Sequence, residues 1–138
     1  MRAQPLIAVN DVVASSLWYA ELLGAKPLGR TKKDMHDGIY NRLLDSDDRI
    51  VLQLHSWDDE PHPGLTDPNR CPVGHGHLLW FEVDDFDDVV ERAFQLEAKI
   101  IEGPLVNNGP KHRELWLEDP DGYILVLASP DGEALKTP

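Results

Sequence analysis

The chain carries an internal repeat, and this repeat constrains the fold more than any other feature of the sequence. Two helix-like segments open alike, at Val9–Asp11 and at Val83–Asp85, so that the second follows the first by 74 residues. An apolar, strand-like run precedes each segment, at Pro5–Ala8 and at Leu78–Phe81. Self-similarity at a fixed offset predicts two copies of one supersecondary unit.

The two halves also end alike. Each helix-like segment closes on a similar run, Leu22–Lys26 in the first half and Gln95–Lys99 in the second. A β-rich run completes each half, at Asp48–Leu54 and at Asp121–Leu127, and from the helix ends onward the offset is 73 residues. With the strand-like runs between them, each half is predicted to be a βαβββ module. The fold class is therefore expected to be α+β.

These elements predict a single domain that contains both modules. Module 1 is expected at about 4–55 and module 2 at about 77–129. The linker between them, 56–76, is rich in proline and glycine and could also serve as a lid. The tail, 130–138, is expected to be frayed.

The composition limits the partners and the compartment. A net charge of −12 disfavours nucleic acid and membranes, whose phosphates are anionic, and it favours cationic ligands, although acidity also simply keeps a protein soluble. The sequence has no apolar run long enough to span a bilayer and no signal-peptide core. The single cysteine, Cys71, rules out an internal disulfide and suits a reducing compartment. We expect a cytoplasmic protein.

Two βαβββ modules in one short chain resemble the vicinal oxygen chelate superfamily. Leu22–Gly24 at the end of the first helix and Glu118–Tyr123 before the last strand carry the resemblance, which extends over about residues 4–129. The superfamily includes glyoxalase I, extradiol dioxygenases, fosfomycin-resistance transferases, methylmalonyl-CoA epimerase and the bleomycin-resistance binding proteins. The resemblance implies an incomplete barrel around a cavity, formed within one chain or by exchange of modules in a homodimer. One such fold hosts several chemistries.

The resemblance also implies where a metal ion would be held. In the metal-using members, the first and last strands of each module supply the ligands. The family's spacing transfers these positions to Gln4, Gln53, Leu78 and Val126. Hard divalent metals need carboxylates, imidazoles or several oxygens, and two amides with two aliphatic groups do not supply them. We therefore expect no metal and no other cofactor.

One residue could supply a missing ligand. His77 is the neighbour of Leu78, but adjacent side chains of a strand point to opposite faces, so that His77 would need a bulge to reach the cavity. The alternative to a metal-free protein is one divalent ion held with its help.

Strand alternation predicts the side chains that line the cavity, because residues two apart on a strand share a face. The predicted lining consists of Gln4, Leu6, Gln53, His55, Leu78, Trp80, His112, Glu114, Trp116 and Val126. A mostly apolar and aromatic lining with a few polar groups suits a small-molecule pocket, and tryptophan faces offer stacking and cation–π contacts. The tryptophans could instead fill the core, and Glu114 could instead pair with a basic residue at the surface.

Three functions remain open. The first is a metal-free binding protein that sequesters an aromatic or cationic compound, similar to the bleomycin-resistance type. The second is a metal-dependent lyase or dioxygenase of the glyoxalase I type, using Gln4, Gln53, Glu114 and His77 around a divalent ion. The third is a metal-independent enzyme in which Glu114 or His112 is the acid or base. We favour the first and expect a homodimer with a small-molecule ligand.

Overall fold

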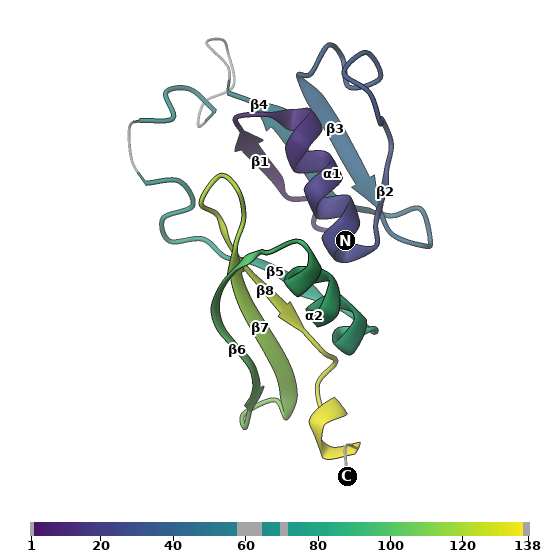
Figure 1. Cartoon of the computed structure of the whole chain (residues 1–138), viewed down its shortest axis with the longest axis vertical. Helices are drawn as coiled ribbons and strands as arrows, with labels where there is room; N and C mark the ends of the chain where they lie inside the picture. Colours follow the sequence, from purple (N-terminus) through teal and green to yellow (C-terminus); the bar gives the residue numbers. More distant parts are fainter. Residues whose placement is uncertain (1, 58–64, 70–71, 137–138) are drawn as a thin grey trace. The chain divides into compact units, whose positions relative to one another are not determined.

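The computed structural model describes residues 2–57, 65–69 and 72–136 (Figure 1). The chain divides into two compact units, residues 1–72 and 73–138. The predicted lid falls partly outside the described residues, and so does Cys71. No helix among the described residues is long and apolar enough to cross a membrane.

Each unit has the order that the repeat predicts, a strand and a helix followed by three strands. The first unit consists of β1 (Leu6–Val9), α1 (Val12–Leu23), β2 (Lys26–Pro27), β3 (Tyr40–Leu44) and β4 (Ile50–Ser56). The second consists of β5 (Leu79–Glu82), α2 (Phe86–Gln95), β6 (Lys99–Asn107), β7 (His112–Glu118) and β8 (Ile124–Ala128), followed by a short 3-10 helix, η1 (Glu133–Lys136).

The two sheets have equivalent topologies. Their strand orders are β1-β4-β3-β2 and β5-β8-β7-β6, and in each the first strand of the unit runs parallel to the last. The α+β class and the paired βαβββ modules are therefore confirmed. The register also follows the repeat: Leu6, Gln53 and Arg42 lie side by side in the first sheet. Trp80, Val126 and Trp116 lie side by side at the equivalent place in the second.

The first helix begins and ends at the residues that the sequence indicates. Asp11 is the N-cap, and its carboxylate accepts a hydrogen bond of 2.9 Å from the Ala14 amide. Gly24 ends the helix in the left-handed conformation, with a φ of 65°, which costs glycine little. Tyr19 and Leu22 are fully buried against the sheet, and α1 contacts β2, β3 and β4.

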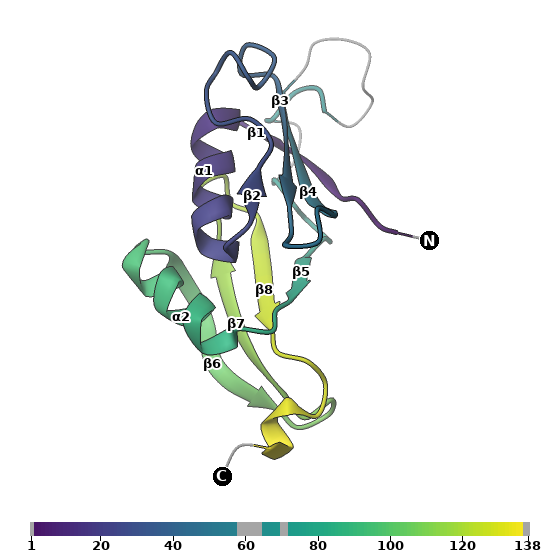
Figure 2. The ribbon, with the colours of Figure 1, turned by 90° about the vertical axis from the view of Figure 1, so that its right-hand side faces the viewer.

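Each helix covers one face of its own sheet (Figure 2). In the second unit, α2 buries Phe86, Val89 and Ala93 and contacts β8. The buried leucines of β7 and β8, among them Leu115 and Leu127, are paired across the two strands and project to this side. The opposite face of each sheet carries the polar and aromatic residues that the sequence assigns to a site.

The structure corrects two expectations. The strand expected at 100–102 runs from Lys99 to Asn107, because the chain passes Gly103–Pro104 on the exposed edge of the sheet, where a proline needs no partner for a missing N–H. The described part of the tail is not frayed: η1 contacts β7, and the Ala134 amide donates to the Lys111 carbonyl over 3.0 Å.

Candidate functional site

The face of the second sheet that is turned away from α2 carries two tryptophans and a buried histidine–glutamate pair. We call it the tryptophan face, and it carries Trp80, His112, Glu114, Trp116 and Val126. Strand alternation places Arg113 on the opposite face, where its guanidinium lies 4.7 Å from the centre of the Phe86 ring. The side assigned to each of these residues from the sequence agrees with the pairing of the strands.

Glu114 is the polar centre of this face. Its side chain is only 4% exposed, and both carboxylate oxygens accept hydrogen bonds. Oε1 accepts from His112 Nε2 at 2.7 Å and from Asn107 Nδ2 at 3.0 Å, and Oε2 accepts from Trp116 Nε1 at 2.9 Å. The surface ion pair considered from the sequence is therefore not what forms, because the partner is a buried histidine on the same strand.

His112 is 5% exposed and lies between two carboxylates. Nε2 contacts Glu114, and Nδ1 contacts Asp131 of the C-terminal segment at 3.1 Å. Burial alone would lower the pKa of His112, but the hydrogen bonds to Glu114 and Asp131 outweigh it and raise the pKa. Burial would likewise raise the pKa of Glu114, but the hydrogen bonds from Trp116, His112 and Asn107 lower it. The arrangement favours an imidazolium–carboxylate pair.

This pairing bears on the acid–base hypothesis. Both ring nitrogens of His112 and both oxygens of Glu114 are engaged by protein groups. A general base must reach the proton that it abstracts, and a lowered pKa weakens a carboxylate as a base. The geometry therefore gives no support to His112 or Glu114 as the acid or base of an enzyme.

The two tryptophans present the aromatic surface of this face. Trp80 is 48% exposed, and its ring centre lies 6.4 Å from that of Trp116, edge to face. The Trp80 ring also lies 6.0 Å from the His112 ring. The indole N–H of Trp116 donates to Glu114, which fixes the orientation of the Trp116 ring beside Trp80.

The equivalent face of the first sheet holds a different polar chain. The Gln53 amide donates through Nε2 to the Gln4 carbonyl over 3.0 Å, and its Oε1 accepts from the Tyr40 hydroxyl. Arg42 Nε donates to the same hydroxyl over 2.8 Å. Neither Tyr40 nor Arg42 belongs to the predicted lining, although both alternate with buried residues on β3 in the way that identified Glu114 on β7.

The other predicted lining residues lie outside these two hydrogen-bond networks. Leu6 and Leu78 are exposed, and Leu78 lies just before β5. His55 pairs with Ala8 and Tyr40 across the sheet, and its Nδ1 lies 2.6 Å from the Ser56 carbonyl. Gln4, Leu6, Gln53 and His55 belong to one unit, and the others belong to the second. A cavity shared by both modules stays a prediction.

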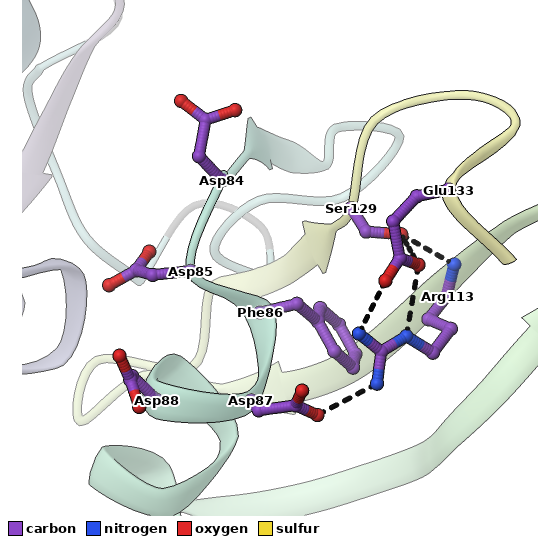
Figure 3. Close-up of a pocket in the computed structure, with 8 residues that line it drawn as sticks. All are labelled: Asp84, Asp85, Phe86, Asp87, Asp88, Arg113, Ser129 and Glu133. Atoms are coloured by element: carbon purple, nitrogen blue, oxygen red, sulfur yellow. Dashed lines mark hydrogen bonds and ion pairs between the residues drawn. The ribbon is translucent and has the colours of Figure 1, made fainter. Parts of the chain in front are cut away.

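A pocket of about 250 Å³ lies on the other side of the second sheet, at the start of α2 (Figure 3). Arg113 lines it, with Nη1 2.7 Å from Asp87 and Nη2 2.6 Å from Glu133. The hydrogen bonds that Arg113 donates to Glu133 and then to Asp87 raise its pKa, so that it stays charged. Because two carboxylates neutralise its charge, Arg113 serves to hold the C-terminal segment on the module. No residue pattern in the sequence indicates this role.

The comparisons with known proteins assign the family. A family model described as the Glyoxalase/Bleomycin resistance protein/Dioxygenase superfamily matches residues 3–127. The chain belongs to this superfamily. No curated protein matches the sequence.

Several solved structures resemble the chain over most of its length. A protein from the mobile metagenome of V. Pseudocholerae is 22% identical, with 94% of each chain covered and a TM-score of 0.66. A glyoxalase/dioxygenase from Nostoc punctiforme is 22% identical over 94% of this chain and 90% of its own, with a TM-score of 0.64. TioX from Micromonospora sp. ML1 is 14% identical over 94% and 98%, with a TM-score of 0.69. At these identities the likeness shows the fold alone.

The residues at the four positions where the family resemblance places metal ligands do not form a suitable site for a divalent metal ion. Gln53 uses both ends of its amide within the protein, and Val126 is a buried aliphatic side chain between the two tryptophans. Leu78 offers no donor, and His77 is exposed outside β5. The donor set is thus one of amides and hydrocarbons, which hard divalent ions bind poorly.

The buried pair makes a pH-dependent contribution to stability. A raised His112 pKa gives stability that is fully present below 6.5, the ordinary value, and is lost as the pH rises through the folded-state pKa. A lowered Glu114 pKa gives stability that is present above 4.5 and is lost as the pH falls through the folded-state pKa. The pair therefore contributes most between pH 4.5 and 6.5.

We predict that His112→Gln lowers the free energy of unfolding by roughly 3 kcal/mol between pH 4.5 and 6.5, because the buried charge of Glu114 loses its partner. The loss should be smaller at about pH 9, because the contribution of a histidine with a raised pKa declines as the pH rises. Urea denaturation at both pH values measures it, with His75→Gln as the control, since His75 is exposed in the loop before β5. An equal loss at the two pH values would contradict the ion pair.

Proposed function

We propose that the protein binds and sequesters a small aromatic compound, with a preference for a cation, on its tryptophan face and without a metal. The observation that carries the proposal is the exposed Trp80 ring beside a Trp116 ring whose orientation Glu114 fixes. An exposed aromatic surface that is already ordered loses little conformational entropy when a planar ligand stacks on it.

The preference for a cation follows from two exposed carboxylates. Glu82 lies two residues after Trp80 on β5, and Glu102 pairs with Trp116 across β6 and β7, so that both project from the tryptophan face. Neither makes an ion pair with another described residue. Glu114 is buried and already neutralised by His112, so that it is not the group that attracts a cation. Glu82 and Glu102 are therefore the groups that would attract a cation.

The donor set at the family's metal positions supports a metal-free binder. Catalysis by a bound ion needs ligands that hold it and a position left open for substrate. Leu78 and Val126 supply no ligand, and the Gln53 amide is satisfied within the protein. Metal analysis of the purified protein after dialysis against a divalent salt tests this part of the proposal, and one retained equivalent per chain would overturn it.

We predict that Trp80→Ala weakens binding of a planar aromatic cation about tenfold, the loss expected for one stacking and cation–π contact. Proflavine is a suitable probe, and isothermal titration calorimetry gives its dissociation constant. Phe94→Ala is the matched control, because Phe94 is 56% exposed on α2, away from the tryptophan face. Equal effects of the two substitutions, or no saturable binding to the wild-type protein, would contradict the proposal.

We also propose that the protein is a cytoplasmic homodimer. The single cysteine suits a reducing compartment. Among the described strands, the nine-residue edge strand β6 pairs with β7 alone, and natural proteins often cover such an edge with a second chain. Sedimentation velocity should give twice the 15.5 kDa mass of one chain, and the mass of one chain at micromolar concentration would contradict the dimer.

A further inference from the structure

Arg42 is held at the end of a directed chain of hydrogen bonds in the first unit. Gln53 donates through Nε2 to the Gln4 carbonyl, so its Oε1 is the acceptor that receives the Tyr40 hydroxyl proton. The Tyr40 oxygen is then the acceptor for Arg42 Nε. Each member of the chain fixes the direction of the next.

These hydrogen bonds use Nε of Arg42 and leave the two terminal nitrogens of its guanidinium available to a ligand. The guanidinium carbon lies 5.5 Å from the centre of the Tyr40 ring, and Nε is used by the Tyr40 hydroxyl. No described residue accepts a hydrogen bond from its two terminal nitrogens. Terminal nitrogens on a guanidinium that is fixed at Nε and packed on a ring form a planar fork, the geometry that matches a carboxylate or phosphate.

The four strands of the sheet that carries Arg42 contain no carboxylate side chain. The rings nearest to Tyr40 are those of His36 and His55, at 6.3 and 6.1 Å, and neither can carry a negative charge. In a chain with a net charge of −12, this acid-free sheet is an unusual place.

Equivalent positions of the two units carry different side chains on this face of the sheet. Arg42 is equivalent to Trp116, because Arg42 pairs with Gln53 as Trp116 pairs with Val126, and Tyr40 is likewise equivalent to Glu114. In both units the later residue donates an N–H to the earlier one on the same strand. The second unit thereby buries a carboxylate, whereas the first presents an arginine to solvent.

We propose that this face of the first sheet binds the oxyanion of a small molecule, a carboxylate or a phosphate, with Arg42 as the bidentate donor and Tyr40 as its positioning residue. Arg42 and Tyr40 belong to the first unit, whereas the tryptophan face belongs to the second, and oxyanion binding requires neither an aromatic ligand nor the function proposed above.

The test is a titration of the full-length ¹⁵N-labelled protein with inorganic phosphate and, separately, with acetate, at constant ionic strength. The Arg42 Nε–Hε signal should shift and saturate with at least one of the two probes. The probe that binds more tightly identifies the group that the site prefers. Arg42→Lys keeps the charge but loses the fork, and it should weaken binding about tenfold. Tyr40→Phe removes the acceptor of Nε and should weaken binding by a smaller factor, about threefold.

Arg49→Lys is the matched control, since Arg49 is an exposed arginine of the same unit outside the hydrogen-bond chain, and it should bind as the wild type does. Because Arg42 and Arg49 are both exposed, neither change should prevent folding, which amide dispersion verifies. Linear, non-saturating shifts, or equal losses for Arg42→Lys and Arg49→Lys, would overturn the site. Trp80→Ala should leave phosphate and acetate binding unchanged, so that failure of the aromatic proposal and failure of this one are distinguishable.

Discussion

The buried pair of Glu114 and His112 determines what the second module can present to a ligand. A carboxylate that is 4% exposed is tolerated only because three donors satisfy it, and one of these donors is Trp116. The same pair therefore supplies stability and fixes an aromatic ring. It also engages both ring nitrogens of His112 and both carboxylate oxygens of Glu114 within the protein.

Duplication gave the two modules one framework, and a few positions on that framework separate their chemistry. Leu6 and Trp80 occupy equivalent places, as do Gln53 and Val126. Arg42 and Trp116 are also equivalent. Each donates an N–H to the side chain two residues earlier on its strand, Arg42 to Tyr40 and Trp116 to Glu114. In the second module, Leu78 and Val126 are aliphatic, and the aromatic residues Trp80 and Trp116 pair with Val126 on the neighbouring strands.

The repeat predicted the order of the elements and the faces of the strands, because hydrophobic alternation and helix caps are local properties. It placed Trp80, Glu114 and Trp116 on one face for the same reason. It did not predict that Glu114 is buried, since that depends on Asn107 and His112, nor that Asp131 and Glu133 hold the tail through His112 and Arg113. Apart from the contact between His112 and Glu114 within β7, these contacts join residues of different segments, and no sequence period encodes them. The extent of β6 was missed because a proline on an edge strand is locally indistinguishable from a turn.

The protonation state of His112 tests this account most directly. Nitrogen-detected NMR of the imidazole ring reports whether each ring nitrogen carries a proton. At pH 6.5, the ordinary pKa of a histidine, the account predicts that both nitrogens of His112 are protonated in most molecules. A neutral ring at that pH, with one nitrogen unprotonated, would contradict the ion pair and with it the fixed aromatic face.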